Sequence, residues 1–128
     1  MKLTEKQKQR YLRNTILPEI GEDGQKKLLK SKVLVIGAGG LGSPVLLYLT
    51  AAGIGNIGIV DFDIVDLSNL QRQVLHNQTN LDQKKILSAK EKLSSLNEDV
   101  LLTVFDCKVN AANLGKILEQ FDLMQIYS

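Results

Sequence analysis

The residues of this chain that could do chemistry are concentrated between positions 61 and 85. The stretch DFDIVDLSNLQRQVLH, residues 61 to 76, directly follows a short apolar run, and QKK comes soon after it. Carboxylates, amides and cations gather here: Asp61, Asp63, Asn69, Arg72, Gln73 and Lys85. Two cations and an amide near a phosphate suit a triphosphate undergoing substitution, because such transfers depend on positioning and charge neutralisation.

A polar, solvated loop is the alternative interpretation of this stretch, since loops carry most polar residues. For Asp66 and Gln71 we prefer that interpretation. His76 is expected to make structural hydrogen bonds rather than to take part in catalysis.

A glycine-rich loop, GAGGLG at residues 37 to 42, precedes this stretch and matches the pattern G-x-G-x-x-G. Gly37 suits a tight turn off a strand, Gly39 lets the backbone approach a phosphate, and Gly42 lets a helix pack against the strand. The helix N-terminus would offer N–H groups and a positive dipole end to an anion. Glycine-rich turns also occur for packing alone, so the neighbouring elements must decide whether this loop binds a phosphate.

Asp61 supplies that context, because it ends the next apolar run, nineteen positions after Gly42. A carboxylate at this place accepts hydrogen bonds from ribose hydroxyls and repels a 2'-phosphate. The adenosine of either NAD or ATP meets this requirement. The polar residues that follow Asp61 favour ATP, because a dehydrogenase needs little beyond its acidic residue at this edge.

Alternating helices and strands must position these residues. Thr4 and Gln7 resemble a capping box that opens a helix carrying RYLRNTIL, which Pro18 and Gly21 interrupt. Further helices are expected over residues 23–30, after the glycine loop to about residue 53, and over 82–96 and 111–120. Strands are expected over residues 32–37, 57–61, 101–106 and 121–126. Tyr11 and Tyr48 are expected to be packing residues on helices.

The predicted fold class is α/β. We expect a Rossmann-like, mostly parallel sheet with helices on both faces, truncated after about four strands and preceded by an N-terminal helical segment. Residues 1–128 would form one N-terminal portion of a nucleotide-binding domain. Within it, residues 1–31 would be a helical arm and residues 32–128 an incomplete Rossmann-like unit.

Composition argues against several classes of protein. The 16 basic and 14 acidic residues give a net charge of +2, without the footprint of a nucleic-acid-binding protein. No window approaches the ~20 apolar residues of a membrane span, and the start lacks the apolar core of a signal peptide, so a cytoplasmic protein is expected. The single cysteine, Cys107, excludes an internal disulfide and a Cys-x-x-Cys zinc pair, and no metal-binding residue is predicted. A reactive thiol is not expected there either.

Three segments of the chain together carry a resemblance to a known family: RYLRNTILPEIG, VLVIGAGGLGSPVLLYLTAAGIGNIGIVDFDIVDLSNLQRQVLH and QKK. They resemble the bacterial E1-like adenylyltransferases of the ThiF, MoeB and HesA type, which activate ubiquitin-like sulfur-carrier proteins for thiamin and molybdopterin synthesis. The resemblance covers nearly the whole chain and is most specific between Arg10 and Lys85. It implies condensation of ATP, with Mg²⁺, and the C-terminal glycine of a carrier protein, which releases pyrophosphate and leaves an acyl adenylate.

The resemblance also implies roles for individual residues. It assigns nucleotide binding to Gly37, Gly39, Gly40, Gly42, Asp61, Asp63, Asn69 and Gln73, and catalysis to Arg72, Lys85 and Arg13. Asp61 would bind the ribose. Asn69, Arg72 and Lys85 would bind the phosphates, and Gln73 would support them. Arg13 would reach across a homodimer into the ATP site of the partner subunit.

The chain departs from the family pattern in two places. A small residue or proline usually precedes the site lysine, and here Lys84 stands there; we expect Lys85 to face the phosphates. In the family, the strand after FDL leads to a D-x-T-D-N segment whose last aspartate binds magnesium, whereas this chain reads MQIYS. We therefore expect an N-terminal fragment or truncated product with impaired activity, and no structural zinc, because the family's zinc-binding cysteines are absent.

Two other functions stay open. An NAD-dependent oxidoreductase fragment would explain GAGGLG and Asp61, but not Asn69, Arg72 and Lys85. A non-catalytic, truncated dimer partner would explain the missing aspartate.

Overall fold

A computed structural model describes residues 1–127 of the chain. Its elements, in chain order, are α1 (Glu5–Arg10), α2 (Leu12–Thr15), α3 (Gly21–Lys30), β1 (Lys32–Ile36), α4 (Gly42–Ala52), β2 (Asn56–Asp61), the short 3-10 helices η1 (Leu67–Asn69) and η2 (Gln78–Asn80), α5 (Lys85–Leu96), β3 (Leu101–Asp106), α6 (Ala111–Leu118) and β4 (Leu123–Ile126). None of the helices among these residues is long and apolar enough to cross a membrane.

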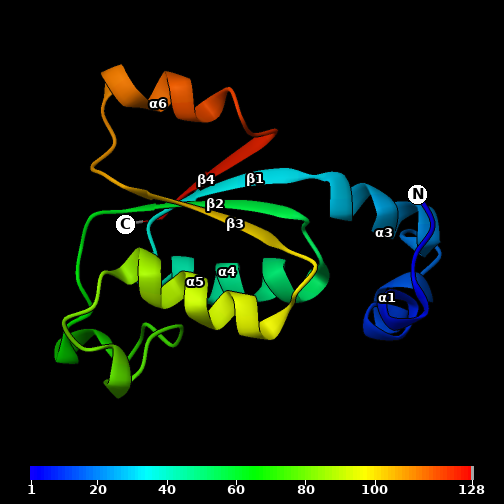
Figure 1. Ribbon diagram of the computed structural model, residues 1–128, viewed down its shortest axis with the longest axis horizontal. Coiled ribbons are helices and arrows are strands. Elements are labelled where there is room, and N and C mark those ends of the chain that lie inside the picture. Colours follow the sequence, from blue (N-terminus) through cyan, green and yellow to red (C-terminus); the bar gives the residue numbers. More distant parts are fainter. Residues whose placement is uncertain (128) are drawn as a thin grey trace.

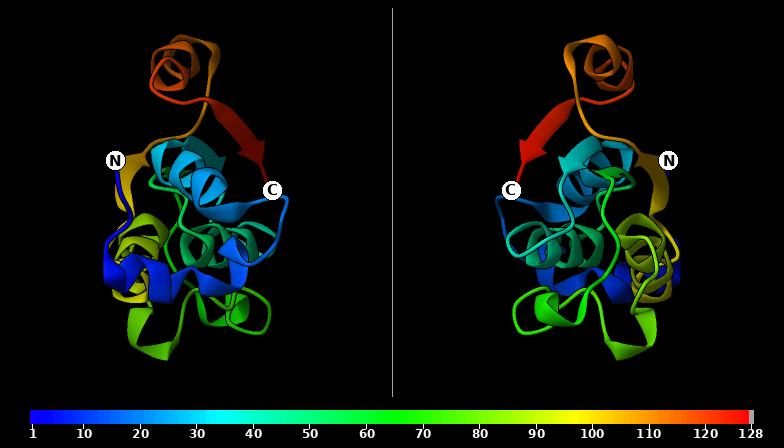
Figure 2. Two further views of the ribbon diagram at one scale, coloured as in Figure 1. Left: turned by 90° about the vertical axis from the view of Figure 1, so that its right-hand side faces the viewer. Right: turned by 90° about the vertical axis from the view of Figure 1, so that its left-hand side faces the viewer.

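The four strands form one sheet in the order β3-β2-β1-β4, and every neighbouring pair is parallel. Helices α4 and α5 cover one face of the sheet and α6 lies over the other (Figure 1), a layering that is also visible when the molecule is viewed end-on (Figure 2). Helices α1 to α3 lie at the end of the sheet where the strands begin. The predicted fold class is confirmed.

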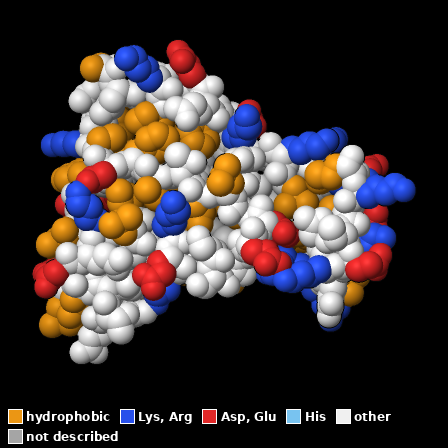
Figure 3. Space-filling view, viewed as in Figure 1, with side chains coloured by type: hydrophobic (Ala, Val, Ile, Leu, Met, Phe, Trp, Pro, Cys, Tyr) orange, Lys and Arg blue, Asp and Glu red, His pale blue; other side chains and the backbone are white. Residues whose placement is uncertain are grey.

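The hydrophobic core is divided between the two faces of the sheet, because strand side chains alternate. Val33 and Val35 of β1 belong to the larger cluster, under α4 and α5, together with Leu46 and Leu93 of those helices. The smaller cluster, on the α6 face, is built on Leu34, Val60 and Ile117. Hydrophobic side chains remain visible between α6 and the sheet in Figure 3, so this second layer is only partly closed.

The first helix differs from its prediction. The capping box is present, since Thr4 Oγ1 accepts from the Gln7 backbone N–H at 3.1 Å and Gln7 Oε1 accepts from that of Thr4 at 3.0 Å. The helix nevertheless breaks at Tyr11, whose φ of −100° and ψ of 13° are not helical. Tyr11 is only 1% exposed and packs as predicted, whereas Tyr48 is 77% exposed and the prediction that it packs is wrong.

Several later boundaries also differ: α3 begins at Gly21, two residues early, and α6 ends at Leu118, two residues early. Helix α5 begins at Lys85 rather than near Asp82, because Asp82 has a left-handed φ of 67° that an α-helix does not contain. Lys84 instead forms an antiparallel bridge with Ile64. Strand β4 begins at Leu123, two residues later than predicted. These breaks come from contacts that local propensity does not register.

Candidate functional site

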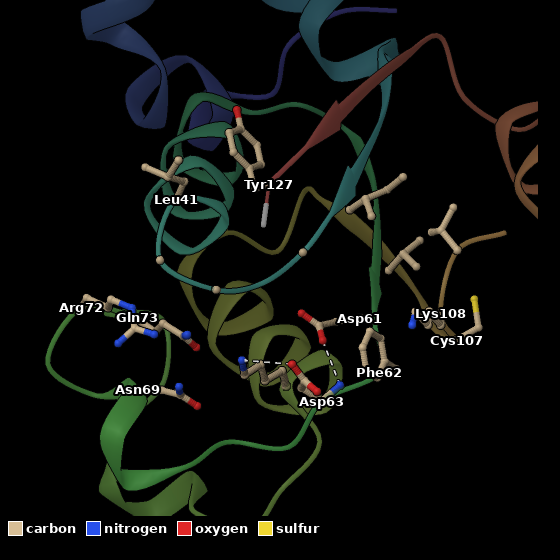
Figure 4. A pocket seen from close by; sticks show the side chains of 17 residues that line it. Leu41, Asp61, Phe62, Asp63, Asn69, Arg72, Gln73, Cys107, Lys108 and Tyr127 are labelled. Atoms are coloured by element: carbon tan, nitrogen blue, oxygen red, sulfur yellow. Dashed lines mark hydrogen bonds and ion pairs between the residues drawn. The ribbon is translucent and has the colours of Figure 1, made fainter.

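A cavity of about 900 Å³ opens at the edge of the sheet where the strands end (Figure 4). Strand order reverses at β1, because β2 and β3 lie on one side of it and β4 on the other. Ligands of open parallel sheets bind outside the carboxyl ends of the strands at such a switch point. Nine of the predicted site residues line the cavity: Gly37, Gly39, Gly40, Asp61, Asp63, Asn69, Arg72, Gln73 and Lys85.

The glycine loop joins β1 to α4 through two positions that admit no side chain. Gly37 has a φ of 103°, and a Cβ there would lie 2.1 Å from the backbone oxygen of Tyr127. A Cβ on Gly42 would lie 1.9 Å from the backbone oxygen of Gly37, so Gly42 lets α4 start directly against the end of β1. Gly42 therefore shapes the loop without lining the cavity. No side chain caps α4, but the Ser43 N–H already donates to the Gly39 carbonyl at 2.9 Å and Pro44 has no N–H, so in this first turn an anion would meet chiefly the Gly42 N–H.

Asp61, at the end of β2, holds the glycine loop in place. Its Oδ2 accepts the Ala38 N–H at 2.8 Å, and its Oδ1 accepts the Asp63 N–H at 2.9 Å. A carboxylate has about four acceptor positions, so two remain for other donors. The side chain can therefore order the loop and still accept hydrogen bonds from a ribose in the cavity.

The two adjacent lysines are separated by the structure. The Lys85 side chain lines the cavity, is only 7% exposed, and has its Nζ 3.8 Å from Asp63 Oδ2. Its backbone N–H also donates to the Asp63 carbonyl at 3.0 Å. Lys84 is exposed and forms an ion pair with Asp106 outside the cavity lining. The geometry thus agrees with the expectation that Lys85, rather than its neighbour, faces a ligand.

Asn69 ends a tight capped turn that begins at Asp66. Asp66 accepts the Ser68 N–H at 3.0 Å, and Asn69 Oδ1 accepts the Asp66 N–H at 3.1 Å. Hydrogen bonds from the Ser68 hydroxyl and N–H hold the pKa of the Asp66 carboxyl below its usual value. Asp66 is exposed, so its role in this loop is local and structural, while the turn directs Asn69 into the cavity.

Arg72 and Gln73 follow that turn and differ in burial. Arg72 is exposed and extends past the glycine loop: a Cβ on Gly40 would lie 3.6 Å from Arg72 Cδ. Gln73 is 4% exposed, and its Oε1 is buried without a hydrogen-bond partner among residues 1–127. Native structures rarely leave a buried polar atom unpaired, so this amide indicates a place for a ligand or water.

His76 supports the loop from behind. The ring is 4% exposed, with Nε2 2.9 Å from the Ala38 carbonyl oxygen and Nδ1 2.7 Å from Ser88 Oγ. Burial lowers the pKa of His76, which favours the neutral ring. A carbonyl can only accept, so Nε2 carries the proton and Nδ1 accepts from the Ser88 hydroxyl. The predicted structural role is confirmed.

Sequence reasoning missed several residues of the cavity wall, including Phe62, Lys108, Val109 and Tyr127. Lys108 Nζ lies 5.9 Å from the centre of the Phe62 ring, within the range of a cation–π contact. Each of these residues follows the end of a strand, β2, β3 or β4. Since parallel strands end at one edge, that position was the signal that could have found them.

Arg13 is the one predicted catalytic residue that does not line the cavity. It is exposed on α2, at the end of the sheet where the strands begin, whereas the cavity is at the opposite end. Its action across a homodimer stays a prediction.

Comparison with known proteins places the chain in a family. It is 48% identical over 115 residues to the probable adenylyltransferase/sulfurtransferase MoeZ of Mycobacterium tuberculosis, a match covering 90% of this chain and 29% of that protein. It is 42% identical over 124 residues to the sulfur carrier protein adenylyltransferase of Thermus thermophilus, covering 97% of this chain and 46% of that protein. The chain thus spans less than half the length of these two relatives.

Among solved structures, that of E. coli MccB with ATP superimposes on this chain with a TM-score of 0.76 at 31% identity. The superposition covers 84% of this chain and 33% of that one. The profile of the ThiF family matches residues 11–125, which include both the arm residue Arg13 and the whole glycine loop. The resemblance to E1-like adenylyltransferases is confirmed, and the chain belongs to the ThiF family.

Proposed function

We propose that the cavity binds ATP with Mg²⁺, and that the complete protein adenylates the C-terminal glycine of a ubiquitin-like sulfur-carrier protein in thiamin or molybdopterin biosynthesis. The observation that carries the proposal is the convergence of Arg72, Lys85 and the glycine loop on one cavity that also contains Asp61. The names of the two relatives, both adenylyltransferases, support the reaction type. Residues 1–127 would contribute the nucleotide-binding part of that reaction.

The distribution of side chains suggests how ATP would lie. In Figure 4, Asn69, Arg72 and Gln73 stand on one side of the cavity, Phe62 and Lys108 on the other, and Asp61 between them. The triphosphate would lie on the cationic side along the glycine loop, with the ribose at Asp61. The adenine would then contact the wall around Phe62, an arrangement of mainly apolar lining with few polar groups that is usual for cofactor sites.

Magnesium would enter this site with the nucleotide. Among residues 1–127, no group of three or more His, Cys, Asp or Glu side chains is placed to hold a metal ion. Mg²⁺ is usually bound through substrate phosphates, waters and one or two carboxylates. Asp63 is an exposed carboxylate at the cavity that could supply one such ligand. The ion would add charge neutralisation to that provided by Arg72 and Lys85.

The proposed reaction needs alignment more than it needs a base. The C-terminal carboxylate of the carrier is ionised at neutral pH. One of its oxygens would form a bond to the α-phosphorus while the bond from that phosphorus to the bridging oxygen breaks. The electron pair leaves with pyrophosphate. Arg72, Lys85 and the partner's Arg13 would stabilise the negative charge that develops on the leaving group.

A calorimetric titration of the 128-residue chain with Mg-ATP, and separately with NAD, tests the nucleotide assignment. We expect ATP binding that Arg72→Ala weakens by about 10- to 100-fold, the effect of losing a charged hydrogen bond. Gln71→Ala is the matched control, because this exposed neighbour does not line the cavity. Binding of NAD alone would favour the oxidoreductase. The absence of a binding signal with both ligands would refute a nucleotide site in these residues.

A further inference from the structure

The short helix α2 has two different sides. Tyr11, its N-cap, and Asn14 turn toward the body of the protein, where Tyr11 is fully buried and Asn14 is half-buried. Leu12, Arg13 and Ile16 turn toward solvent. Arg13 therefore stands between two anchored residues and is flanked by exposed apolar side chains, which suits a surface that meets another protein.

Tyr11 is tied to a segment that lies more than eighty positions away. Its hydroxyl donates to Asp99 Oδ2 at 2.8 Å and accepts from Asn97 Nδ2 at 2.9 Å. Asn97 is itself buried, and its Nδ2 also donates to the Thr50 carbonyl at 2.9 Å. Burial, assisted by the Asp99 carboxylate, raises the pKa of Tyr11 to about 12, so the phenol keeps the proton that it donates. The three hydroxyl and amide contacts join the arm to both α4 and the loop after α5.

A second set of hydrogen bonds fixes the other end of α2. Asn14 Nδ2 donates to Gln25 Oε1 at 3.0 Å and to the Ala52 carbonyl at 3.3 Å. Gln25, which is fully buried in α3, donates to the same carbonyl at 2.9 Å. Gly53 completes the fit, because a Cβ there would lie 2.6 Å from both Tyr11 Cε1 and Gln25 Nε2. The arm is therefore built into the body at an orientation set by two buried amides and a phenol.

This orientation keeps Arg13 away from the cavity of its own chain. The arm lies where the strands begin and the cavity where they end. Strands of five or six residues at ~3.3 Å each separate the two by roughly 15–20 Å, which is longer than an arginine side chain. A contact between Arg13 and a nucleotide must come from a second copy of the chain.

We propose that Tyr11, Asn97 and Asp99 are positioning residues, which hold Arg13 in the orientation needed to complete the nucleotide site of a second copy of this chain. The proposal rests on the proposed function. It predicts that a defect at Tyr11 appears in the site of the partner rather than in the cavity of the mutated chain.

Mixed dimers test this prediction, because they separate the arm of a chain from its cavity. Tyr11→Phe removes both hydrogen bonds of the hydroxyl and keeps the ring against Gly53. We expect Arg13→Ala to weaken Mg-ATP binding by about 10- to 100-fold, and Tyr11→Phe to weaken it by up to about tenfold. The Tyr11→Phe chain is then coexpressed with the Arg72→Ala chain under a second tag, and the mixed dimers are isolated through both tags.

In the mixed dimer, the intact cavity belongs to the Tyr11→Phe chain and receives the unaltered arm of its partner. Recovery of one wild-type ATP site per dimer is the expected result. Weak binding in the mixed dimer would show that Tyr11 supports only its own chain, and would overturn the proposal. So would wild-type binding by the Tyr11→Phe homodimer, by the Arg13→Ala homodimer, or by a chain that binds ATP as a monomer. Failure of the wild-type chain to bind ATP would instead refute the proposed function.

Two further variants guard against a folding defect. Asp99→Asn keeps an oxygen that can accept from Tyr11 and should bind ATP like the wild type, whereas Asp99→Ala should resemble Tyr11→Phe and be restored by the same mixing. Tyr48→Phe is the matched control for removal of a tyrosine hydroxyl, because Tyr48 is 77% exposed on α4. If Asp99→Asn is as defective as Asp99→Ala, the hydrogen bond to Tyr11 is not the element that positions Arg13.

Discussion

The two ends of the sheet treat polar side chains in opposite ways. Where the strands begin, Tyr11, Asn14, Gln25 and Asn97 are bonded to one another or to backbone carbonyls. Where the strands end, Arg72 is exposed and Gln73 Oε1 is buried without a partner among the described residues. The arm end also has one buried unpaired atom, Thr50 Oγ1, among the described residues. Its other polar side chains fix the arm, whereas the cavity end leaves a cation and an amide available for a ligand.

Lys85 shows this difference most sharply. It is a nearly buried cation at the first position of α5, where the helix dipole is unfavourable to positive charge. Its ion pair with Asp63, at 3.8 Å to an exposed carboxylate, compensates only in part. A residue that breaks two local rules without full compensation indicates a functional site. The partly satisfied groups at this end are what a triphosphate would complete.

The largest effect is expected from Lys85→Ala compared with Lys84→Ala. Removing the Lys85 cation should weaken Mg-ATP binding by about 10- to 100-fold and slow adenylation by the complete protein by about 100- to 1,000-fold. Lys84→Ala removes only an exposed ion pair with Asp106 and should leave ATP affinity within about twofold. Titration of both variants measures the difference. Equal losses would remove the distinction between the two lysines.

At the opposite end, Gly53→Ala should reduce stability rather than nucleotide affinity. Gly53 has a φ of 88°, and its Cβ would overlap the Tyr11 ring and the Gln25 amide. The left-handed conformation and the overlap together should lower the free energy of unfolding by about 2 to 3 kcal/mol. Urea denaturation followed by circular dichroism measures this change.

Gly115→Ala is the matched control for Gly53→Ala. Gly115 lies within α6, and a Cβ there meets nothing within 4 Å. The substitution should raise stability by about 0.5 to 1 kcal/mol, because alanine favours a helix interior. If Gly53→Ala were neutral or stabilising like Gly115→Ala, the conclusion that Gly53 packs tightly against Tyr11 and Gln25 would be refuted.

The strands and the cavity were predictable because their signals are local. The apolar runs, the glycine loop and the carboxylate at Asp61 lie on consecutive elements, and parallel strands bring their ends to one edge. Arg72 and Lys85 follow β2 along the chain and line the cavity at that edge, while their catalytic roles stay a prediction. Phe62 and Lys108 were within reach of the same argument.

The arm was less predictable because its contacts are distant in sequence. The first helix breaks at Tyr11, whose hydroxyl is bonded to Asn97 and Asp99. The stretch RYLRNTIL contains no signal for partners so distant in the sequence. The delayed start of α5 depends on the left-handed Asp82 and on a bridge between Lys84 and Ile64. Tertiary contacts override local propensity at both places.

The last prediction concerns His76, which links the glycine loop to α5. Burial lowers the pKa of His76 in the folded chain, while the unfolded chain titrates near pH 6.5. Below about pH 6.5 the unfolded state therefore binds a proton that the folded state does not. Stability should be fully present above this pH and should fall, by at most about 1.4 kcal/mol per pH unit, as the pH drops toward the folded pKa.

Urea midpoints at pH 7.5, 6.5 and 5.5 measure this loss, with His76→Gln as the comparison. His76 is the one histidine of the sequence, and the lowered pKa values of Asp66 and Glu98 affect only more acidic solutions. The variant should be less stable at pH 7.5 but nearly independent of pH over this range. Parallel profiles for the two chains would mean that the ring is not held neutral between Ala38 and Ser88. The support of the glycine loop would then have to come from its other contacts, among them those of Ala38 with the Asp61 carboxylate and the Ser43 hydroxyl.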